Sequence, residues 1–397
     1  MEYTMRCRHL DRHLPSPLLA ALLLALLVVF PGPETAQAQV QEIKINYGFS
    51  REFPPFSYER DGEPAGFEVE LLQAVLSEVE NLEITMKPLD WIQVQMDLSD
   101  GVIELTTGMA RTEQRMLLYD FSDQPTVSIK VRLFTQTTNR ISNPTQLRGR
   151  RVAVKEGSLY QRVLEEIGGM NIKLYPTESE ALKALYNGDV DAFCGADKTA
   201  IYTIRHLGLT GISPVGTPLD ITDLHFAVNR DQQWLLDAVN LGMRRVVENG
   251  EYDALYRKWF VVEMDETEQN QLIQAASEAA INAYAPYSQT PIGAAVLGMS
   301  GATYTGCNVE NGVSGFSATA LTVAVHNAVN SGETDIRAAV AVAPDGSLIT
   351  PTAEERRLLQ EFGRGILVLT EPEPGRFVVR TIAELLPYPY QPDLRTY

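Results

Sequence analysis

Short apolar runs alternate with stretches of helical spacing from residue 43 to about residue 260. In chain order the pattern predicts a strand over Ile43–Phe49, a helix over Phe67–Val79, strands over Leu82–Met86, Val102–Thr107 and Arg151–Val154, a helix over Leu159–Ile167, a strand over Ile172–Leu174, a helix over Glu178–Tyr186 and a strand over Val190–Phe193. Such alternation is typical of an α/β fold with parallel sheets. Because two such series follow one another, we expect two lobes with a ligand in the crevice at the carboxyl ends of the strands.

The pattern changes after an acidic, polar stretch that we interpret as a linker over residues 263–270. Beyond it a second domain is expected over residues 271–397. Its predicted elements are a helix over Leu272–Tyr284, strands over Ile292–Leu297 and Thr303–Asn308, a helix over Phe316–Val329, a strand over Ile336–Ala343, a helix over Glu354–Phe362 and a strand over Ile366–Leu369. This mixture again indicates an α/β domain.

The N-terminus has the composition of a secretory signal peptide. Three arginines, Arg6, Arg8 and Arg12, precede an apolar run over Leu18–Phe30, and Ala36-Gln37-Ala38 is a small-residue cleavage site. An uncleaved anchor is the alternative, but the run is shorter than the ~20 residues that span a bilayer. We therefore expect residues 1–38 to be removed, and a solute-binding domain over residues 39–262 to be exported to the periplasm or the extracellular space.

The charge of the chain bears on its partners. A formal net charge of −18 argues against nucleic acid and anionic lipid as partners, because both repel an acidic surface. The hydrophobic share of 45% is that of an ordinary globular protein.

The stretch from Gly108 to Arg115 is the first candidate for a binding site. A small-residue turn follows an apolar run and opens a short helical segment that carries Arg115. Backbone N–H groups at a helix start, with a guanidinium one turn later, can clamp a carboxylate. The alternative is that Arg115 is a solvated helix residue, as most arginines are.

This stretch, with Tyr119-Asp120-Phe121-Ser122-Asp123 after it, resembles the ligand-binding strand of the bacterial extracellular solute-binding proteins, which include amino-acid receptors of uptake transporters. The resemblance extends over the whole two-lobed segment and implies the fold of periplasmic binding proteins (type II). It implies stacking aromatics, carboxylate donors, a hydroxyl from the second lobe and a carboxylate for the ligand's ammonium, here Phe53, Trp91, Gly108, Ala110, Arg115, Ser158 and Asp197.

Two positions depart from the family pattern. Ala110 stands where the family usually has a threonine, and Asp197 lies one residue further from Asp191 than usual. With Arg115 and Asp197 at its two ends, the site would bind a small amino acid or related polar solute, and a membrane permease or sensor would receive the closed form. Because the same fold hosts dehydratases of the arogenate type, an enzyme remains the alternative, with Glu68 or Asp197 as its acid.

The C-terminal segment resembles the cytidine deaminase family over its full length, which implies an α/β/α fold. The resemblance rests on Tyr284-Ala285-Pro286-Tyr287-Ser288, on Gly306-Cys307-Asn308-Val309-Glu310-Asn311 and on Arg356 to Phe362. Deamination in this family needs a zinc-bound water and a glutamate that moves its protons. The family also forms dimers and tetramers, so the domain could assemble the receptor into a homo-oligomer.

The zinc ligands of the family are replaced in this chain. Its three thiolate positions are Thr319, Thr352 and Glu355, and its acid–base glutamate is Leu321. A lone carboxylate with two hydroxyls is a poor zinc site. We therefore expect no metal, no cofactor and no deaminase chemistry, although a residual deaminase remains the alternative for this domain.

Two residues that would hold a nucleoside's ribose are retained, Asn308 and Glu310. They indicate either nucleoside binding without catalysis or a purely structural use, since Asn and acidic side chains often stabilise turns. The sequence slightly favours a structural or assembly role.

Overall fold

The computed structural model describes residues 3–6, 42–139, 141, 144–313, 315–373 and 375–386. The expected signal peptide therefore lies outside the described residues, apart from a short strand, β1 (Tyr3–Arg6), that pairs with β6. Among the residues that are described, no helix is long and apolar enough to cross a membrane.

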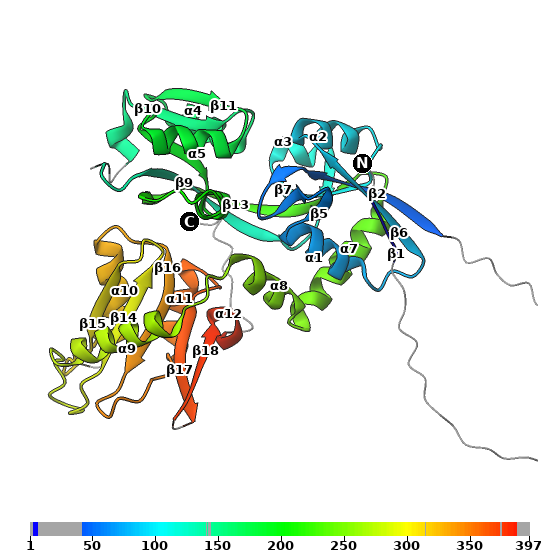
Figure 1. The fold of residues 1–397 in the computed structure, drawn as a ribbon. Helices are drawn as coiled ribbons and strands as arrows, with labels where there is room; N and C mark the ends of the chain where they lie inside the picture. The colour runs from blue at the N-terminus through cyan, green and yellow to red at the C-terminus, as the bar shows by residue number, and fades with distance from the viewer. Residues whose placement is uncertain are drawn as a thin grey trace, which may run out of the picture.

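The first lobe is built on parallel strands with helices against them (Figure 1). Its elements are β2 (Ile43–Ser50), β6 (Leu82–Leu89), β7 (Leu105–Ala110), β8 (Tyr119–Phe121), α1 (Phe67–Leu76), α2 (Trp91–Ser99), α3 (Glu113–Met116), α7 (Gln233–Glu248), α8 (Glu251–Phe260) and a small sheet of β3 (Glu52–Phe53), β4 (Ser57–Arg60) and β5 (Glu63–Ala65). β2 pairs in parallel with both β6 and β7.

The second lobe repeats this arrangement. Its elements are η1 (Pro144–Leu147), β10 (Arg151–Lys155), β11 (Asn171–Tyr175), β12 (Ala192–Ala196), α4 (Leu159–Ile167), α5 (Glu178–Asn187) and α6 (Asp197–His206). β10 lies between β11 and β12 and pairs in parallel with both.

Two long antiparallel strands join the lobes, β9 (Val127–Gln136) and β13 (Ile212–Asn229). β13 pairs with β7 of the first lobe at its end and with β9 along most of its length, while β9 continues to β12 of the second lobe. We call β9 and β13 the hinge strands, since the described chain crosses between the lobes along them. The register between them shifts between Val215 and Asp220.

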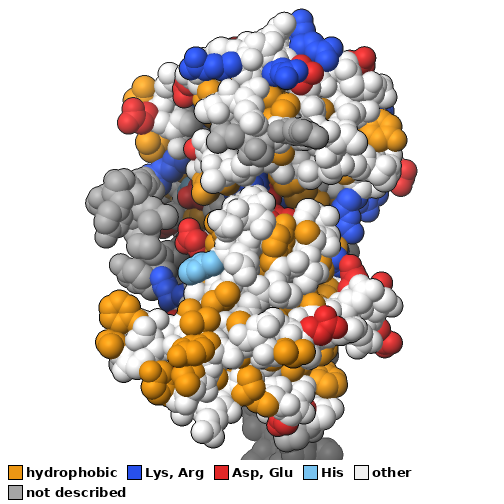
Figure 2. All heavy atoms as spheres, turned by 90° about the vertical axis from the view of Figure 1, so that its left-hand side faces the viewer, with side chains coloured by type: hydrophobic (Ala, Val, Ile, Leu, Met, Phe, Trp, Pro, Cys, Tyr) orange, Lys and Arg blue, Asp and Glu red, His pale blue; other side chains and the backbone are white. Residues whose placement is uncertain are grey.

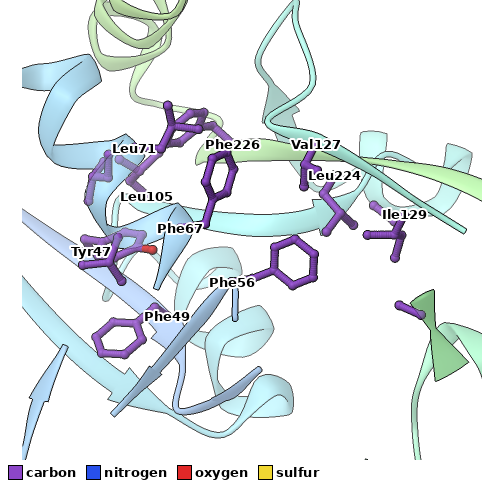
Figure 3. Packing of buried hydrophobic residues seen from close by; sticks show 14 of the residues in the cluster. Tyr47, Phe49, Phe56, Phe67, Leu71, Leu105, Val127, Ile129, Leu224 and Phe226 are labelled. Atoms are coloured by element: carbon purple, nitrogen blue, oxygen red, sulfur yellow. The ribbon is translucent and has the colours of Figure 1, made fainter. Parts of the chain in front are cut away.

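A continuous apolar core runs from the first lobe to the hinge strands. In Figure 3 the Phe56 ring lies beside the aliphatic side chains of the hinge strands, and the β2 rings lie further away within the first lobe. The labelled residues are Tyr47, Phe49, Phe56, Phe67, Leu71, Leu105, Val127, Ile129, Leu224 and Phe226. Burial of these side chains stabilises the first lobe and its packing on the hinge strands, because burying each aliphatic or aromatic side chain contributes about 1.5–3 kcal/mol.

The C-terminal domain has three layers, as its resemblance to cytidine deaminases implied. Its elements are α9 (Glu266–Ala280), β14 (Gly293–Gly298), β15 (Thr303–Cys307), α10 (Ala320–Asn330), β16 (Ile336–Val342), α11 (Ala353–Phe362), β17 (Leu367–Glu373), β18 (Arg376–Thr381) and α12 (Ile382–Leu385). The sheet order is β15-β14-β16-β17-β18. Alternate residues of β14 pack against α9 on one face and against α10 on the other, as in Ala295 and Ala294.

The stretch interpreted as an acidic linker is shorter than expected. Helix α9 begins at Glu266, and Asp265 and Glu268 form a capping box at its start. The acidic residues of this stretch therefore belong largely to a helix N-terminus, where carboxylates are favourable because they accept bonds from unpaired backbone N–H groups.

Candidate functional site

A cavity of about 430 Å³ lies between the two lobes. The first lobe supplies residues 50–53, 89–93, Gly108, Ala110 and Arg115, the second lobe supplies residues 155–160, Pro176 and Glu178, and the hinge strands supply Ile129 and Leu224. The volume suits a small ligand that is enclosed from both sides. Six of the seven ligand-binding residues expected from the sequence line it, and Asp197 does not.

Arg115 is held in a fixed position at the edge of the first lobe. Thr112 caps the short helix α3 and accepts from the Arg115 backbone N–H. The guanidinium donates to the Ala110 carbonyl oxygen at 3.1 Å and to Gln95 Oε1 at 3.2 Å. It also lies 5.7 Å from the centroid of the Trp91 ring. Burial lowers the pKa of Arg115, but a guanidinium stays protonated in proteins, so the cavity has a positioned positive charge.

Gly108 brings backbone rather than side chain to the cavity. Its φ of +68° is in the left-handed region that glycine tolerates. A Cβ at this position would lie 3.5 Å from the Phe53 ring, so the aromatic covers this turn. Phe53 in turn stacks on Phe56 with ring centroids 4.8 Å apart.

The second lobe presents the start of helix α4. Ser158 caps that helix, accepting from the Gln161 N–H, and its hydroxyl donates to the Lys155 carbonyl oxygen at 2.7 Å. The hydroxyl is therefore committed to the turn. What reaches the cavity is a helix N-terminus, which favours negatively charged groups.

Asp197 lies away from this cavity, contrary to the role expected for it. It is the first residue of α6, where its Oδ1 accepts from the Lys130 N–H of β9 at 3.0 Å and its Oδ2 is 3.5 Å from Lys198 Nζ. It lines a second cavity, between the hinge strands and the C-terminal domain. The physical reason is the extra residue already visible in the sequence, since Ala196 ends strand β12 and Asp197 is moved into the helix.

The sequence did not indicate Glu178 as a residue of the binding site. It is the first residue of α5 and lines the cavity from the lobe opposite Arg115. Burial raises its pKa, against the lowering effects of the Thr199 hydroxyl and the Lys155 charge. An acidic residue after a Thr177 cap looks like an ordinary helix start, so no sequence signal distinguished it.

In the C-terminal domain, Asn308 and Glu310 bind backbone groups of one loop. Asn308 accepts from the Ile292 N–H at 2.8 Å and donates to the Thr290 carbonyl oxygen at 3.1 Å. Glu310 accepts from the N–H groups of Tyr287 and Ser288, and these bonds, with that of the Ser288 side chain first, lower its pKa. Both side chains therefore stabilise this loop through its backbone groups, and the choice between structural use and nucleoside binding stays a prediction.

The positions of the family's zinc ligands are helix caps in this chain. Thr319 caps α10 and accepts from the Thr322 N–H, while Thr352 caps α11 in a capping box with Glu355. Glu355 Oε2 accepts from both the backbone N–H and the hydroxyl of Thr352, and Leu321 is fully buried. Within the described ranges, no group of three or more His, Cys, Asp or Glu side chains could hold a metal ion.

The profile of the bacterial extracellular solute-binding proteins, family 3, matches residues 45–262, more than half of the 397 residues. The chain belongs to this family. The profile of the cytidine and deoxycytidylate deaminase zinc-binding region matches residues 245–350. The predicted combination of a solute-binding module, the two lobes, with a cytidine deaminase-like domain is confirmed.

Each of the following relatives matches one of these two parts of the chain. The L-cystine-binding protein TcyJ of Escherichia coli K12 is 26% identical over 217 residues, which are 54% of this chain and 81% of that protein. The cytidine deaminase of Sporosarcina psychrophila is 32% identical over 127 residues, which are 32% of this chain and 93% of that protein. An ancestral arginine-binding protein bound to arginine superposes with a TM-score of 0.51 at 27% identity, over 55% of this chain and 98% of that one.

Glu68, the other acid considered for an enzyme, lies behind the solute-binding cavity. It is fully buried, its Oε1 accepts from the Thr126 hydroxyl at 2.8 Å, and its Cδ would be 4.0 Å from a Cβ at Gly108. Burial raises its pKa to about 7. Neither Glu68 nor Asp197 lines the cavity, so the geometry does not favour a dehydratase that uses either of them.

The raised pKa of Glu68 predicts a pH dependence of stability. A carboxyl whose pKa rises from 4.5 to about 7 on folding stabilises the folded chain below about pH 4.5, and this contribution is lost as the pH rises through 7. The free energy of unfolding should therefore fall by on the order of 3 kcal/mol between about pH 4.5 and pH 8, and E68Q should remove this component. Urea unfolding across this range checks it; equal pH slopes for the wild type and E68Q would contradict it.

Proposed function

We propose that the solute-binding module captures a small amino acid by closure of its lobes, for delivery to a membrane permease or a sensor after export. The observation that carries the proposal is a cavity whose charged lining includes Arg115 on the first lobe and Glu178 on the second, where Lys155 also lines it. Arg115 and the backbone at Gly108 suit a carboxylate, and Glu178 suits an ammonium. The names of an L-cystine-binding and an arginine-binding relative support the same ligand class.

The closing step needs no chemical change in the ligand. An amino acid that contacts both lobes binds the closed arrangement better than the open one and shifts the population toward it. Phe53 and Trp91 would cover the apolar part of the ligand, since both rings line the cavity on the first lobe.

The proposal is tested by a thermal-shift screen of the mature chain against the common amino acids and nucleosides. A ligand that binds only the folded state raises the unfolding midpoint by mass action. We expect a shift with at least one amino acid and none with cytidine. Shifts with nucleosides alone would contradict the assignment.

Glu178→Gln should weaken amino-acid binding by about 10-fold or more, because a hydrogen bond to a charged group contributes about 1.5–3 kcal/mol. The matched control is Glu180→Gln, since Glu180 is an exposed acid in the same helical turn. Titration calorimetry with the amino acid and with its deaminated analogue separates the roles. The analogue should bind both variants equally, and equal losses for both ligands would mean that Glu178 acts only through the fold.

We also propose that the C-terminal domain is catalytically inactive. Its former ligand positions serve as helix caps, and Leu321 has replaced the proton-transferring glutamate. Purified protein should contain less than about 0.1 zinc per chain by elemental analysis, because a three-ligand site is absent at these positions. It should not deaminate cytidine. Near-stoichiometric zinc would overturn this account.

The C-terminal domain also offers a surface for a second copy of the chain. Figure 2 shows several exposed hydrophobic side chains on its lower half, formed by this domain. Exposed large hydrophobic residues between 281 and 316 are Ile281, Tyr284, Tyr287, Val309, Val313 and Phe316. Tyr284 forms a β-bridge with Val309, so at least these two are adjacent. We expect self-association in sedimentation that F316S weakens and F377S, at an exposed position in β18, does not; a monomer at all concentrations would contradict it.

A further inference from the structure

The C-terminal domain contacts the second-lobe end of the hinge. Arg132 of β9 is fully buried and forms an ion pair with Asp335, and it also donates to Thr334 Oγ1 at 2.7 Å. The same guanidinium donates to the Gly216 carbonyl oxygen at 2.6 Å, at the register shift of the hinge strands. The buried Arg132 guanidinium thus connects both hinge strands with the C-terminal domain.

A second cation of the same strand makes a further contact. Lys130 Nζ donates to the Phe362 carbonyl oxygen at 3.1 Å and lies 3.8 Å from Asp335 Oδ1. Lys130 and Arg132 are two residues apart and therefore point to one face of β9. That face of the hinge is covered by the C-terminal end of α11 and by the residues just before β16.

The C-terminal domain also contacts the first lobe, through helix α8. Arg364 forms an ion pair with Asp253, and its guanidinium lies 4.7 Å from the Tyr252 ring centroid. Arg257 Nη1 is 3.3 Å from Glu384 Oε1. Helix α8 belongs to the first lobe, because its Tyr252 and Phe260 rings pack against Phe67 of α1, with ring centroids 5.8 and 4.8 Å away.

A cavity of about 680 Å³ lies between these two sets of contacts. It is lined by α6 of the second lobe, α8 of the first lobe and residues 360–366 of the C-terminal domain. The lobes also meet directly, where the hydroxyls of Tyr58 and Tyr202 are 3.2 Å apart. Any change in the angle between the lobes must therefore alter this space and at least one set of contacts.

We propose that the C-terminal domain is an intramolecular brace that holds the two lobes in the arrangement that forms the ligand cavity, and so sets the affinity of the solute-binding module. A simple appendage would need only its covalent connection through residues 261–265. The noncovalent contacts with β9 add a second anchor, and two anchors on two lobes favour one angle between them. The proposal rests on the proposed capture of an amino acid in the cavity.

The brace acts by changing a population. The apparent dissociation constant equals the intrinsic one divided by the fraction of molecules in the binding-competent arrangement. Contacts that exist only in this arrangement raise that fraction. By reciprocity, the bound ligand strengthens the docking of the C-terminal domain by the same factor.

The test removes the contacts between the C-terminal domain and helix α8 and leaves its contacts with strand β9 intact. R364Q should weaken amino-acid binding about 3-fold and the double variant R364Q/R257Q about 5–10-fold, since each substitution removes a half-buried ion pair and R364Q also removes a cation–π contact. K258Q is the matched control, because Lys258 lies on the same helix but pairs within the first lobe. Calorimetry should give K258Q the wild-type affinity within about twofold.

A ligand-free measurement keeps the brace distinguishable from the proposed function. Spin labels at M96C on α2 and L174C on β11, both exposed, report the distance between the lobes in a C307S background. R364Q/R257Q should broaden the distance distribution of the unliganded chain, and K258Q should not. If no amino acid binds the wild type, the proposed function fails while the distances still decide the brace. Unchanged distances and affinity in the double variant would overturn the brace.

Discussion

Replacing Arg115 by alanine is expected to weaken amino-acid binding by about 100-fold or more, because two charge-assisted hydrogen bonds to the ligand carboxylate would be lost. The geometry on which this rests is a guanidinium already fixed by the Ala110 carbonyl and Gln95. Little conformational entropy remains to be lost when the ligand binds. Titration calorimetry of R115A and the wild type with the same amino acid measures the effect.

The control for this prediction is Arg111→Ala. Arg111 is exposed, four residues away, and does not line the cavity, so R111A should bind like the wild type. R115K should recover only part of the loss, since an ammonium cannot form the planar, two-donor contact of a guanidinium. Wild-type affinity in R115A would show that the ligand carboxylate, or the ligand itself, lies elsewhere.

The second large effect is expected in stability rather than binding. Asp335→Ala leaves the buried Arg132 guanidinium without its carboxylate, and breaking a buried ion pair in this way costs about 3–5 kcal/mol. Because the pair connects the hinge to the C-terminal domain, the loss should separate the unfolding of the two parts. Urea unfolding followed by tryptophan fluorescence measures it, since the three tryptophans Trp91, Trp234 and Trp259 all lie in the solute-binding module.

Two further variants are compared with D335A. D345A changes an exposed aspartate of the same domain whose carboxylate accepts from Ser347 of its own turn, and it should shift the unfolding midpoint much less than D335A. R132L/D335L replaces both partners by apolar residues and should be more stable than D335A, since no unpaired charge remains buried. A D335A midpoint equal to that of D345A would refute the structural importance of this pair.

Much of the fold followed from the hydrophobic pattern, whereas the hinge did not. Strands β2, β6 and β10 lie where alternating apolar runs predicted them. The 18-residue strand β13 was missed, because Pro214, Gly216 and Pro218 are typical of a loop. Pairing with β9 on both sides of the register shift overrides that local preference, and pairing between distant segments leaves no local signal.

Some strands and helices begin at other residues than the hydrophobic pattern predicted, and the physical reasons are local. The strand expected from Val102 begins at Leu105, since Gly101 with a φ of +72° directs the chain through a turn first. The helix expected from Phe316 begins at Ala320, because Thr319 is its cap. Caps and turns fix element ends more strongly than hydrophobicity does.

The candidate site was predictable where a motif carried it. The stretch around Gly108 and Arg115 has a spacing specific enough to place those residues in one cavity, while Asp197 depended on a spacing that the chain does not keep. Glu178 could be found only in three dimensions, because its position opposite Arg115 depends on how the two lobes face each other across the hinge.

Titration calorimetry of the mature chain with the amino acid that gives the largest thermal shift tests the central claim most directly. The account predicts one binding site per chain, lost in R115A and kept in R111A, and no heat with cytidine. Amino-acid binding that survives in R115A, or binding of cytidine in place of any amino acid, would contradict it.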